Sequence, residues 1–360
     1  MRVFRFPVVF ALAALAALAQ TPAAVTIEEY EPKSTLVVPR TEIKRAKYPF
    51  VDVHLHIADR PDELLRTMDS LNMRVMVSSF VRGGVGEPLK KRIESLRAAS
   101  PDRFVVFGNI DYRGLDEPGY AERAAAQVEQ DLRAGSRGLK VWKDFGMMLK
   151  DKDGKRVPAD DPRFDKVFEV CAKYQAPVLI HTADPKQFWD PIDKYNERWL
   201  DLKLHPNRAR TGEPSWDTLI AEQHRLFARH PRTIFINAHM GWLAFDLARL
   251  GAVLDKLPNV YLDLSATIVE LGRQPRAARA FFTRYQDRVL FGKDTWRADE
   301  YANYFRTVET ADEYFDHERK YQGVWKIYGM DLPDEVLRKL YYRNALRVIP
   351  GIPRELFPAN

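Results

Sequence analysis

The chain has a single cysteine, Cys171, among its 360 residues, so a disulfide within the chain is excluded. It also lacks a basic block, because the formal net charge is only +6 and the Lys and Arg residues are interspersed with Asp and Glu. Nucleic-acid-binding surfaces usually show as clusters of Lys and Arg. With 46% apolar and 29% charged residues, the composition is that of a globular protein and excludes a disordered or collagen-like chain. We therefore expect no nucleic-acid partner.

Long apolar runs are scarce, and the one at the start of the chain is too short to cross a bilayer. Arg2 and Arg5 precede residues 7–19, which are almost wholly apolar and end in the small-residue sequence Ala-Leu-Ala. A membrane-spanning helix needs about 20 apolar residues, whereas this pattern is typical of a secretory signal peptide. We expect residues 1–19 to be removed and the protein to be exported, periplasmic or secreted, with no stable membrane insertion afterwards. An uncleaved anchor is the alternative.

From residue 48 onward, short β-branched runs alternate with helical patterns. The strand-like runs are 50–57, 75–81, 104–110, 138–143, 177–181, 234–239, 260–264 and 289–292. The helical patterns are 62–72, 87–99, 120–134, 162–174, 216–230, 242–257 and 275–286, followed by an amphipathic helix at 334–348. A crossover helix returns the chain to the same end of a sheet, so the strands should be parallel. Eight such units predict an α/β fold, a (β/α)8 TIM barrel with a C-terminal helical extension.

A doubly wound open sheet is the competing architecture. That fold has a glycine-rich nucleotide-binding turn after its first strand, where this chain has His54-Leu55-His56. The sequence therefore favours the barrel. The expected organisation is a signal peptide (1–19), an N-terminal arm or linker (20–47), the barrel with its C-terminal helices (48–350) and a tail (351–360). The long connections 144–161 and 182–215 are typical of binding loops.

Potential metal ligands stand at the carboxyl ends of four predicted strands. His54 and His56 lie two apart on one strand, so they share a face; that face could also be a polar surface. His181, His239 and Asp294 each follow an apolar strand, which places them on the catalytic face of a barrel. Imidazole nitrogens and a carboxylate oxygen suit Zn²⁺ or a similar divalent ion, with one position left for water.

Several of these stretches are similar to one known family. The matching pieces are Val51-Asp52-Val53-His54-Leu55-His56, His181, His239-Met240-Gly241, Phe291-Gly292-Lys293-Asp294 and Arg343-Asn344-Ala345. They resemble the amidohydrolase superfamily, in its amidohydrolase-related branch, which resembles aminocarboxymuconate semialdehyde decarboxylase and related metal-dependent hydrolases. The resemblance covers about residues 48 to 350.

The resemblance implies a metal site with assigned roles. His54, His56, His181 and Asp294 would hold one divalent ion, expected to be Zn²⁺, while His239 would contact the water or the substrate. Asp294 and His239 would be the catalytic residues, with Asp294 accepting a proton from the water. Lys140 lies where some relatives carry a carboxylated lysine that bridges two metal ions. An ordinary lysine that pairs with an acid or binds a substrate carboxylate is the favoured alternative.

Four further residues are candidates for the pocket wall, because each lies close to a strand end. They are Trp142, Trp242, Trp296 and Arg297. The segment 296–297 stands where the family branch often has a proline, so the wall should differ here. Aromatic and cationic residues in the connection 182–215 suit a planar or acidic small-molecule substrate. Self-association into a homo-oligomer stays open.

Taken together, the residues and the resemblance predict an exported metal-dependent hydrolase. It would act on a C–N or C–O bond of a small amide, lactone or ester by means of a metal-activated water. The first alternative is a metal-dependent, non-oxidative decarboxylase (a lyase) of a small unsaturated or aromatic acid. The second is a non-catalytic metal-binding barrel.

Overall fold

The structure, a computed structural model, describes residues 24–57, 60–212 and 214–359. The expected signal peptide lies outside these residues. The described residues divide into two units, one that ends at Val37 and one that begins at Val38. In the first unit, the described residues carry a short turn and are exposed. Within the described ranges, no helix combines the length and the apolar character that crossing a membrane requires.

The second unit is built on a parallel sheet. Its strands are β1 (Phe50–His56), β2 (Met73–Ser79), β3 (Phe104–Gly108), β4 (Gly138–Val141), β5 (Val178–Ile180), β6 (Phe235–Asn237), β7 (Val260–Asp263), β8 (Val289–Leu290) and β9 (Asp294–Thr295). They follow the order β8-β7-β6-β5-β4-β3-β2-β1-β9, and each neighbouring pair is parallel. Their apolar side chains form the core of the unit.

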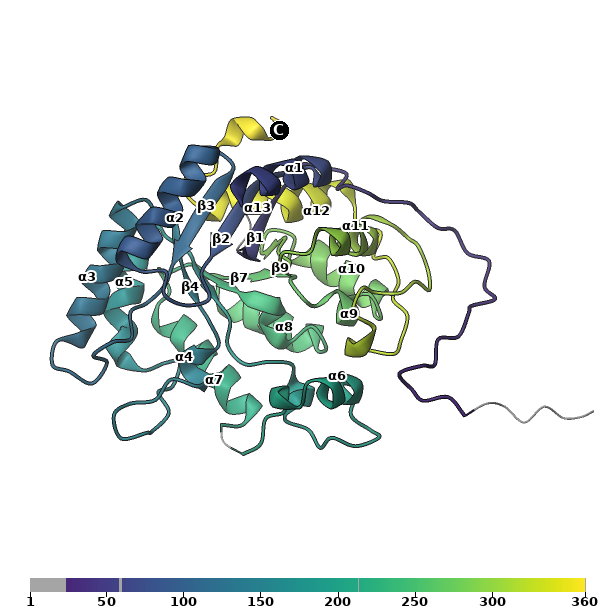
Figure 1. The fold of residues 1–360 in the computed structure, drawn as a ribbon, viewed down its shortest axis with the longest axis horizontal. Helices are drawn as coiled ribbons and strands as arrows, with labels where there is room; N and C mark the ends of the chain where they lie inside the picture. Colours follow the sequence, from purple (N-terminus) through teal and green to yellow (C-terminus); the bar gives the residue numbers. More distant parts are fainter. Residues whose placement is uncertain (1–23, 58–59, 213, 360) are drawn as a thin grey trace, which may run out of the picture. The chain divides into compact units, whose positions relative to one another are not determined.

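The last strand closes the sheet into a barrel. Only residues 291–293 separate β8 from β9, so the two form one interrupted strand that pairs with β7 on one side and with β1 on the other. The Val53 amide also donates to the Phe291 carbonyl at 3.0 Å across this seam. The predicted (β/α)8 barrel is therefore confirmed, with a break in its eighth strand (Figure 1).

Helices surround the strands. They are α1 (Pro61–Leu71), α2 (Gly86–Ala99), α3 (Tyr120–Arg133), α4 (Asp144–Met147), α5 (Asp165–Lys173), α6 (Trp199–Leu204), α7 (Trp216–Arg229), α8 (Leu247–Lys256), α9 (Ile268–Leu271), α10 (Pro275–Arg284) and α11 (Tyr301–Glu309). Each of the longer ones buries an apolar stripe; α5, for example, buries Val167, Phe168 and Cys171. Ser215 caps α7, because its hydroxyl accepts from the Thr218 amide at 3.2 Å.

The predicted helix 242–257 begins later than expected. Residues Ala238–Trp242 instead form a tight turn, in which His239, Met240, Gly241 and Trp242 all have positive φ, between 53° and 60°. L-residues seldom adopt this left-handed conformation in succession. The helix α8 starts only at Leu247, after Asp246, whose side chain accepts from the Arg249 amide at 3.0 Å. The helical periodicity of the sequence continues through this turn, so the predicted helix began too early.

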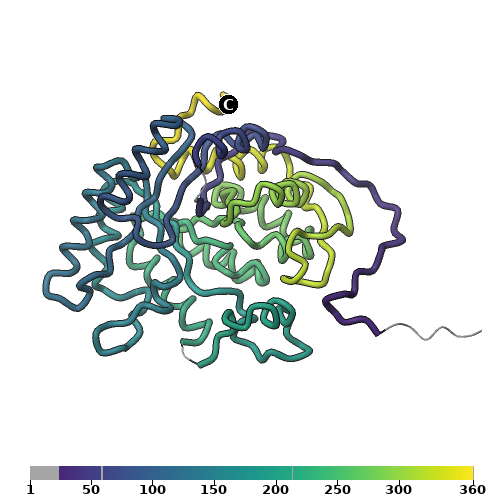
Figure 2. Tube along the Cα trace, in the orientation of Figure 1, coloured from purple at the N-terminus to yellow at the C-terminus, as the bar shows by residue number. Residues whose placement is uncertain are grey.

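The predicted C-terminal helix 334–348 is present as three contiguous pieces. They are α12 (Asp334–Arg338), the π-helical turn η7 (Lys339–Arg343) and α13 (Asn344–Val348). The Leu340 carbonyl of the π turn accepts from the Phe291 amide at 3.0 Å. Asn344 Nδ2 donates to the carbonyls of Gln286 and Val289, at 2.8 Å each. This helix therefore holds the broken eighth strand, and Figure 2 shows its yellow segment beside the dark-blue start of the barrel.

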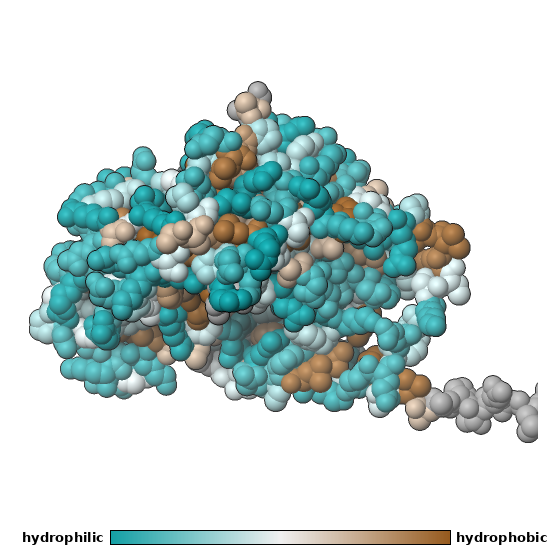
Figure 3. Space-filling view, turned by 45° about the horizontal axis from the view of Figure 1, so that its top comes forward, coloured by the Kyte–Doolittle hydropathy of each residue, from teal (hydrophilic) through white to brown (hydrophobic). Residues whose placement is uncertain are grey.

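Part of the expected N-terminal arm packs on the barrel. The Thr41 amide and hydroxyl both donate to Asp312 at 2.7 Å, and the Lys47 amide donates to Glu309 at 2.9 Å. At the other end, the Phe357 ring stacks on Tyr342 with centroids 5.3 Å apart. The face drawn in Figure 3 is mostly hydrophilic, with hydrophobic residues in small separate patches.

Candidate metal centre

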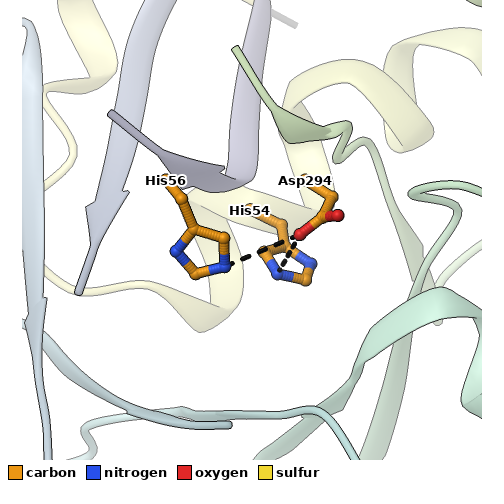
Figure 4. A group of neighbouring side chains, drawn as sticks. All are labelled: His54, His56 and Asp294. Atoms are coloured by element: carbon orange, nitrogen blue, oxygen red, sulfur yellow. Dashed lines mark ion pairs between the residues drawn. The ribbon is translucent and has the colours of Figure 1, made fainter. Parts of the chain in front are cut away.

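Three of the predicted ligands meet at the seam of the barrel. His54 and His56 lie on β1, and Asp294 lies on β9. Asp294 Oδ1 is 3.4 Å from His54 Nε2 and 3.6 Å from His56 Nε2 (Figure 4). Asp294 has a φ of 81°, a strained backbone conformation of the kind that is common at functional sites. The three ligand atoms lie close enough to one another to hold one ion.

The two histidines of β1 are oriented by acceptors behind them. His54 Nδ1 lies 3.0 Å from Asp263 Oδ2, and His56 Nδ1 lies 3.0 Å from the Ser79 carbonyl. A carbonyl or carboxylate oxygen only accepts, so each Nδ1 carries the proton and each Nε2 keeps its lone pair. His56 Nε2 is buried and has no hydrogen-bond partner among the described residues. A metal ion is the partner that such an atom fits.

His181, directly after β5, and His239, in the turn after β6, repeat this arrangement. His181 Nε2 lies 3.1 Å from the Ala183 carbonyl, and His239 Nδ1 lies 3.0 Å from the Ser265 carbonyl. Their inner nitrogens, His181 Nδ1 and His239 Nε2, face each other at 3.2 Å. Two lone pairs at this distance repel unless a cation or a proton lies with them. His181 thus adjoins the site through His239, whose ring centroid is 5.1 Å from that of His54.

Burial keeps the imidazoles of His56, His181 and His239 neutral. It lowers the pKa of His56 to about 3 and that of His239 to about 4, and it lowers the pKa of His181 well below its ordinary value. Burial opposes the ionisation of Asp294, but attraction to the positive charge that the neighbouring imidazoles and Lys140 carry when protonated outweighs burial and lowers the pKa of this carboxyl to about 2. Neutral imidazoles beside an ionised carboxylate are the protonation states that a divalent ion needs.

Asp263 is a functional residue that the sequence reasoning missed. It is fully buried at the end of β7, and its Oδ1 accepts from the amides of His239 (3.1 Å) and Ser265 (2.9 Å) while its Oδ2 faces His54. The proximity of His54 overcomes burial and lowers the pKa of this carboxyl. The signal was available, because Asp263 lies on the polar side of the predicted strand 260–264, as His54 does on the first strand.

Lys140 also reaches the centre. Its side chain is buried on β4, and its Nζ lies 2.7 Å from His54 Nε2. Burial lowers the pKa of this amine to about 8. The structure thus places Lys140 at the predicted ligands, where either of the two roles considered for it is within reach.

The pocket candidates divide into two groups. Trp242 stacks on His239 with ring centroids 4.5 Å apart, and Trp142 lines a cavity that also borders Lys140. Trp296 packs edge-on against Tyr301, and Arg297, with 61% of its side chain exposed, pairs with Asp299. Neither of these last two lines the cavities described next.

Three cavities border the centre in the described part of the chain, and the one at His56, of about 240 Å³, lies beside β1 and β2. The other two adjoin the remaining candidate residues. One of about 170 Å³ lies over His181, His239 and Asp294, and its walls include Lys143, Arg198 and Arg319. The other, of about 630 Å³, extends from Lys140 along the carboxyl ends of β2, β3 and β4. The arrangement can therefore hold a divalent ion between a small, charged cavity and a larger one.

Solved structures share this fold at low sequence identity. A TIM-barrel protein from Bordetella bronchiseptica is 16% identical with a TM-score of 0.52, covering 83% of this chain and 97% of that chain. The 4-oxalomesaconate hydratase of Rhodopseudomonas palustris is 14% identical with a TM-score of 0.52, covering 84% and 96%. The dihydroxybenzoic acid decarboxylase of Polaromonas sp. JS666, with bound manganese and 2-nitroresorcinol, is 15% identical with a TM-score of 0.51, covering 84% and 96%.

The sequence itself matches a family model. No curated protein matches the chain, but residues 51–351 match the model described as amidohydrolase. The matched range begins on β1 and ends beyond α13, so it contains all the candidate ligands and the C-terminal helix. The chain therefore belongs to the amidohydrolase family.

Proposed function

We propose that this chain is a metal-dependent hydrolase that cleaves a C–N or C–O bond of a small amide, lactone or ester. One observation carries the proposal: four largely buried imidazoles donate outward to oxygen atoms, which leaves four lone pairs directed inward beside an ionised carboxylate. In the proposed site, His54, His56, His181 and Asp294 hold one divalent ion, Zn²⁺ or an ion of similar preference.

The residues of the chain supply the rest of the chemistry. A divalent ion bound here would polarise the scissile bond and lower the pKa of a coordinated water. Asp294, ionised at neutral pH, accepts a proton from the attacking water. His239 is held by the Ser265 carbonyl and by the stacked Trp242 ring, so its Nε2 lone pair is placed to accept a hydrogen bond from the water or from an O–H or N–H group of the substrate.

The chemical state of Lys140 decides whether the site holds one metal ion or two. We propose that it acts as an amine, because the carboxylates of Asp294 and Asp263 attract its charged form. Metal analysis of protein purified without chelators tests this. About one equivalent per chain is expected, whereas two equivalents would assign Lys140 as a carboxylated bridge.

A metal-dependent decarboxylase is the second candidate, and one observation favours it. Lys140 presents an amine at the floor of a cavity with apolar and aromatic walls, a setting that suits a planar acid. In such a reaction the same ion and cations would stabilise the developing negative charge. The solved decarboxylase with bound manganese has the same fold.

Two substrate panels separate these functions. The metal-loaded protein is given lactones, esters and amides with a pH readout, and aromatic acids with a CO2 readout. Turnover of the first panel is expected, and CO2 release without hydrolysis would assign the decarboxylase. Asp294→Asn should lower kcat by about 10²–10⁴-fold, while Asp299→Asn, at an exposed position on the same segment, should not. Stoichiometric metal without turnover of either panel would indicate a non-catalytic barrel.

We also propose that the protein acts after export, on the strength of the sequence of its first nineteen residues. Expression of the full chain in a bacterial host, followed by fractionation and N-terminal sequencing, tests this. A periplasmic product that begins at residue 20 is expected. A full-length product in the cytoplasm would contradict the proposal.

A further inference from the structure

The larger cavity has a wall composition unlike that of the metal centre. It measures about 630 Å³ and lies over the carboxyl ends of β2, β3 and β4, within the size range of small-molecule pockets. Its apolar and aromatic lining consists of Val81, Val85, Pro88, Ile110, Tyr112 and Trp142. Only one end, at Lys140, touches the predicted ligands. A substrate that reacts at the centre therefore has room to extend its apolar part into this cavity.

An arginine and a tryptophan stand together in its wall. The Arg82 guanidinium carbon lies 4.8 Å from the Trp142 ring centroid, and Arg82 Nε donates to Asp144 Oδ2 at 2.9 Å. These two contacts orient the guanidinium, whose side chain is 59% exposed, and the contact with Asp144 is also an ion pair. Among the described residues, this is the only hydrogen bond that the Arg82 side chain makes, so the N–H groups of both Nη atoms stay available. A guanidinium edge oriented in this way matches a carboxylate.

Both arginines of the lining pair with an aspartate, but Arg82 uses only its Nε for this and keeps both Nη groups for a ligand. Arg113, the other arginine of the lining, is paired with both oxygens of Asp111, at 2.9 Å to Oδ1 and 2.5 Å to Oδ2. Lys140, by contrast, is buried beside His54. The cavity thus combines an amine at the metal centre, the exposed guanidinium edge of Arg82 and the Trp142 ring, over which Lys143 Nζ also lies at 5.6 Å.

We propose that Arg82 and Trp142 determine substrate specificity, and that they select a planar aromatic group carrying a carboxylate at the end remote from the reacting bond. The ring lies against Trp142, and the remote carboxylate pairs with the Nη edge of Arg82. The inference deepens the proposed function by naming the substrate class of the same site. It predicts binding, so it can be tested without turnover.

Calorimetry on the metal-loaded, full mature chain provides the test, with three probes. Terephthalate carries a carboxylate at each end of a flat ring, benzoate lacks the remote carboxylate, and trans-cyclohexane-1,4-dicarboxylate lacks the flat ring. Terephthalate should bind most tightly. Arg82→Gln should lower the affinity for terephthalate about tenfold, which corresponds to the loss of one charge-assisted pair. The affinity for benzoate should change by no more than about twofold. Trp142→Leu should abolish the preference for terephthalate over the cyclohexane diacid.

Arg249→Gln is the matched control. The Arg249 guanidinium also lies over a tryptophan, Trp216, at 5.4 Å, and pairs with Asp217, but it does not line this cavity. Its terephthalate affinity should equal that of the unmodified chain. Equal loss in both arginine variants, an unchanged affinity in Arg82→Gln, or equal binding of the flat and the puckered diacid would overturn the inference.

The outcome is independent of the hydrolysis test. Selective terephthalate binding that depends on Arg82, without turnover of either substrate panel, would support this inference and refute the proposed hydrolase. Turnover of the hydrolysis panel, together with a terephthalate affinity that does not depend on Arg82, would support the proposed hydrolase and refute this inference. Urea midpoints of Arg82→Gln and Trp142→Leu, compared with the unmodified chain, show that the folded state is the one being titrated.

Discussion

Replacement of Asp263 by asparagine tests whether the orientation of His54 controls metal binding. The amide side chain of the Asp263→Asn variant keeps one oxygen for the amides of His239 and Ser265, so the backbone contacts of Asp263 Oδ1 can persist. The NH2 group then replaces Oδ2 opposite His54 Nδ1, which sits 3.0 Å away. Two donors cannot share that contact, so the tautomer with the proton on Nε2 is favoured, and only Ser265 Oγ, 3.1 Å away, is left to accept from Nδ1. The lone pair directed at Asp294 and the metal position is lost.

The expected size of the effect follows from this change of tautomer. Substitution of a residue that orients a metal ligand typically lowers metal affinity by about 10–100-fold, or roughly 1.4–2.7 kcal/mol. The full burial of both His54 and Asp263 places the Asp263→Asn variant toward the upper end, because no water can rescue the contact. We therefore expect a Zn²⁺ affinity about 100-fold weaker.

The assay is competition for Zn²⁺ with a chromophoric chelator, and Asp52→Asn is the control. Asp52 is equally buried and bonds the Tyr301 hydroxyl and the His54 amide, but neither of its oxygens faces an imidazole ring. Burial raises the pKa of Asp52 to about 7, so a neutral amide resembles its protonated form. Its Zn²⁺ affinity should stay unchanged. A folded Asp263→Asn protein that binds Zn²⁺ as tightly as the unmodified chain would refute the reasoning.

Three further predictions concern stability. In metal-free protein, burial lowers the pKa of His56 to about 3 and that of His239 to about 4, from 6.5. The unfolded chain therefore binds protons first, and the free energy of unfolding should fall as the pH drops from 6.5 toward 4. Urea midpoints that rise on acidification would contradict this. Asn344→Ala removes two buried hydrogen bonds to backbone carbonyls and should cost about 1–3 kcal/mol in urea unfolding, and an unchanged midpoint would show that the C-terminal helix does not hold the eighth strand. Gly241→Ala should lower the free energy of unfolding by about 1–3 kcal/mol and weaken Zn²⁺ binding. Gly241 has a φ of +60°, and the added Cβ would lie 2.5 Å from Asn237 Nδ2. Thermal unfolding and the chelator assay check the two effects.

The sequence predicted the strands because their apolar runs have distinct lengths and periods. The histidines at the strand ends were accessible for the same reason, since parallel strands bring their carboxyl ends to one edge. The left-handed turn from His239 to Trp242 could not be predicted, because hydrophobic periodicity does not reveal backbone dihedral angles. The break between Phe291 and Lys293 also escaped prediction, since it depends on a bond from Phe291 to the distant Leu340.

Side-chain partners were less predictable than ligands. His54 could be recognised from its pairing with His56, whereas Asp263 is recognised only when the hydrogen bond to His54 is seen. Arg82 lies in the segment after β2, and its contact with Trp142 is seen only in the folded chain. Contacts between distant loops are set by the closed barrel, so a local pattern cannot specify them.

The position of the ligands at the seam has a consequence for the order of assembly. His54 and His56 come from the first strand and Asp294 from the last, so the two halves of the site are far apart in the chain and meet only when the barrel closes. Closing so long a loop is entropically costly before the intervening elements have folded. An ion taken up here would therefore bind after the barrel has closed and would link its first and last strands. Metal uptake would then report that the last strand has paired with the first.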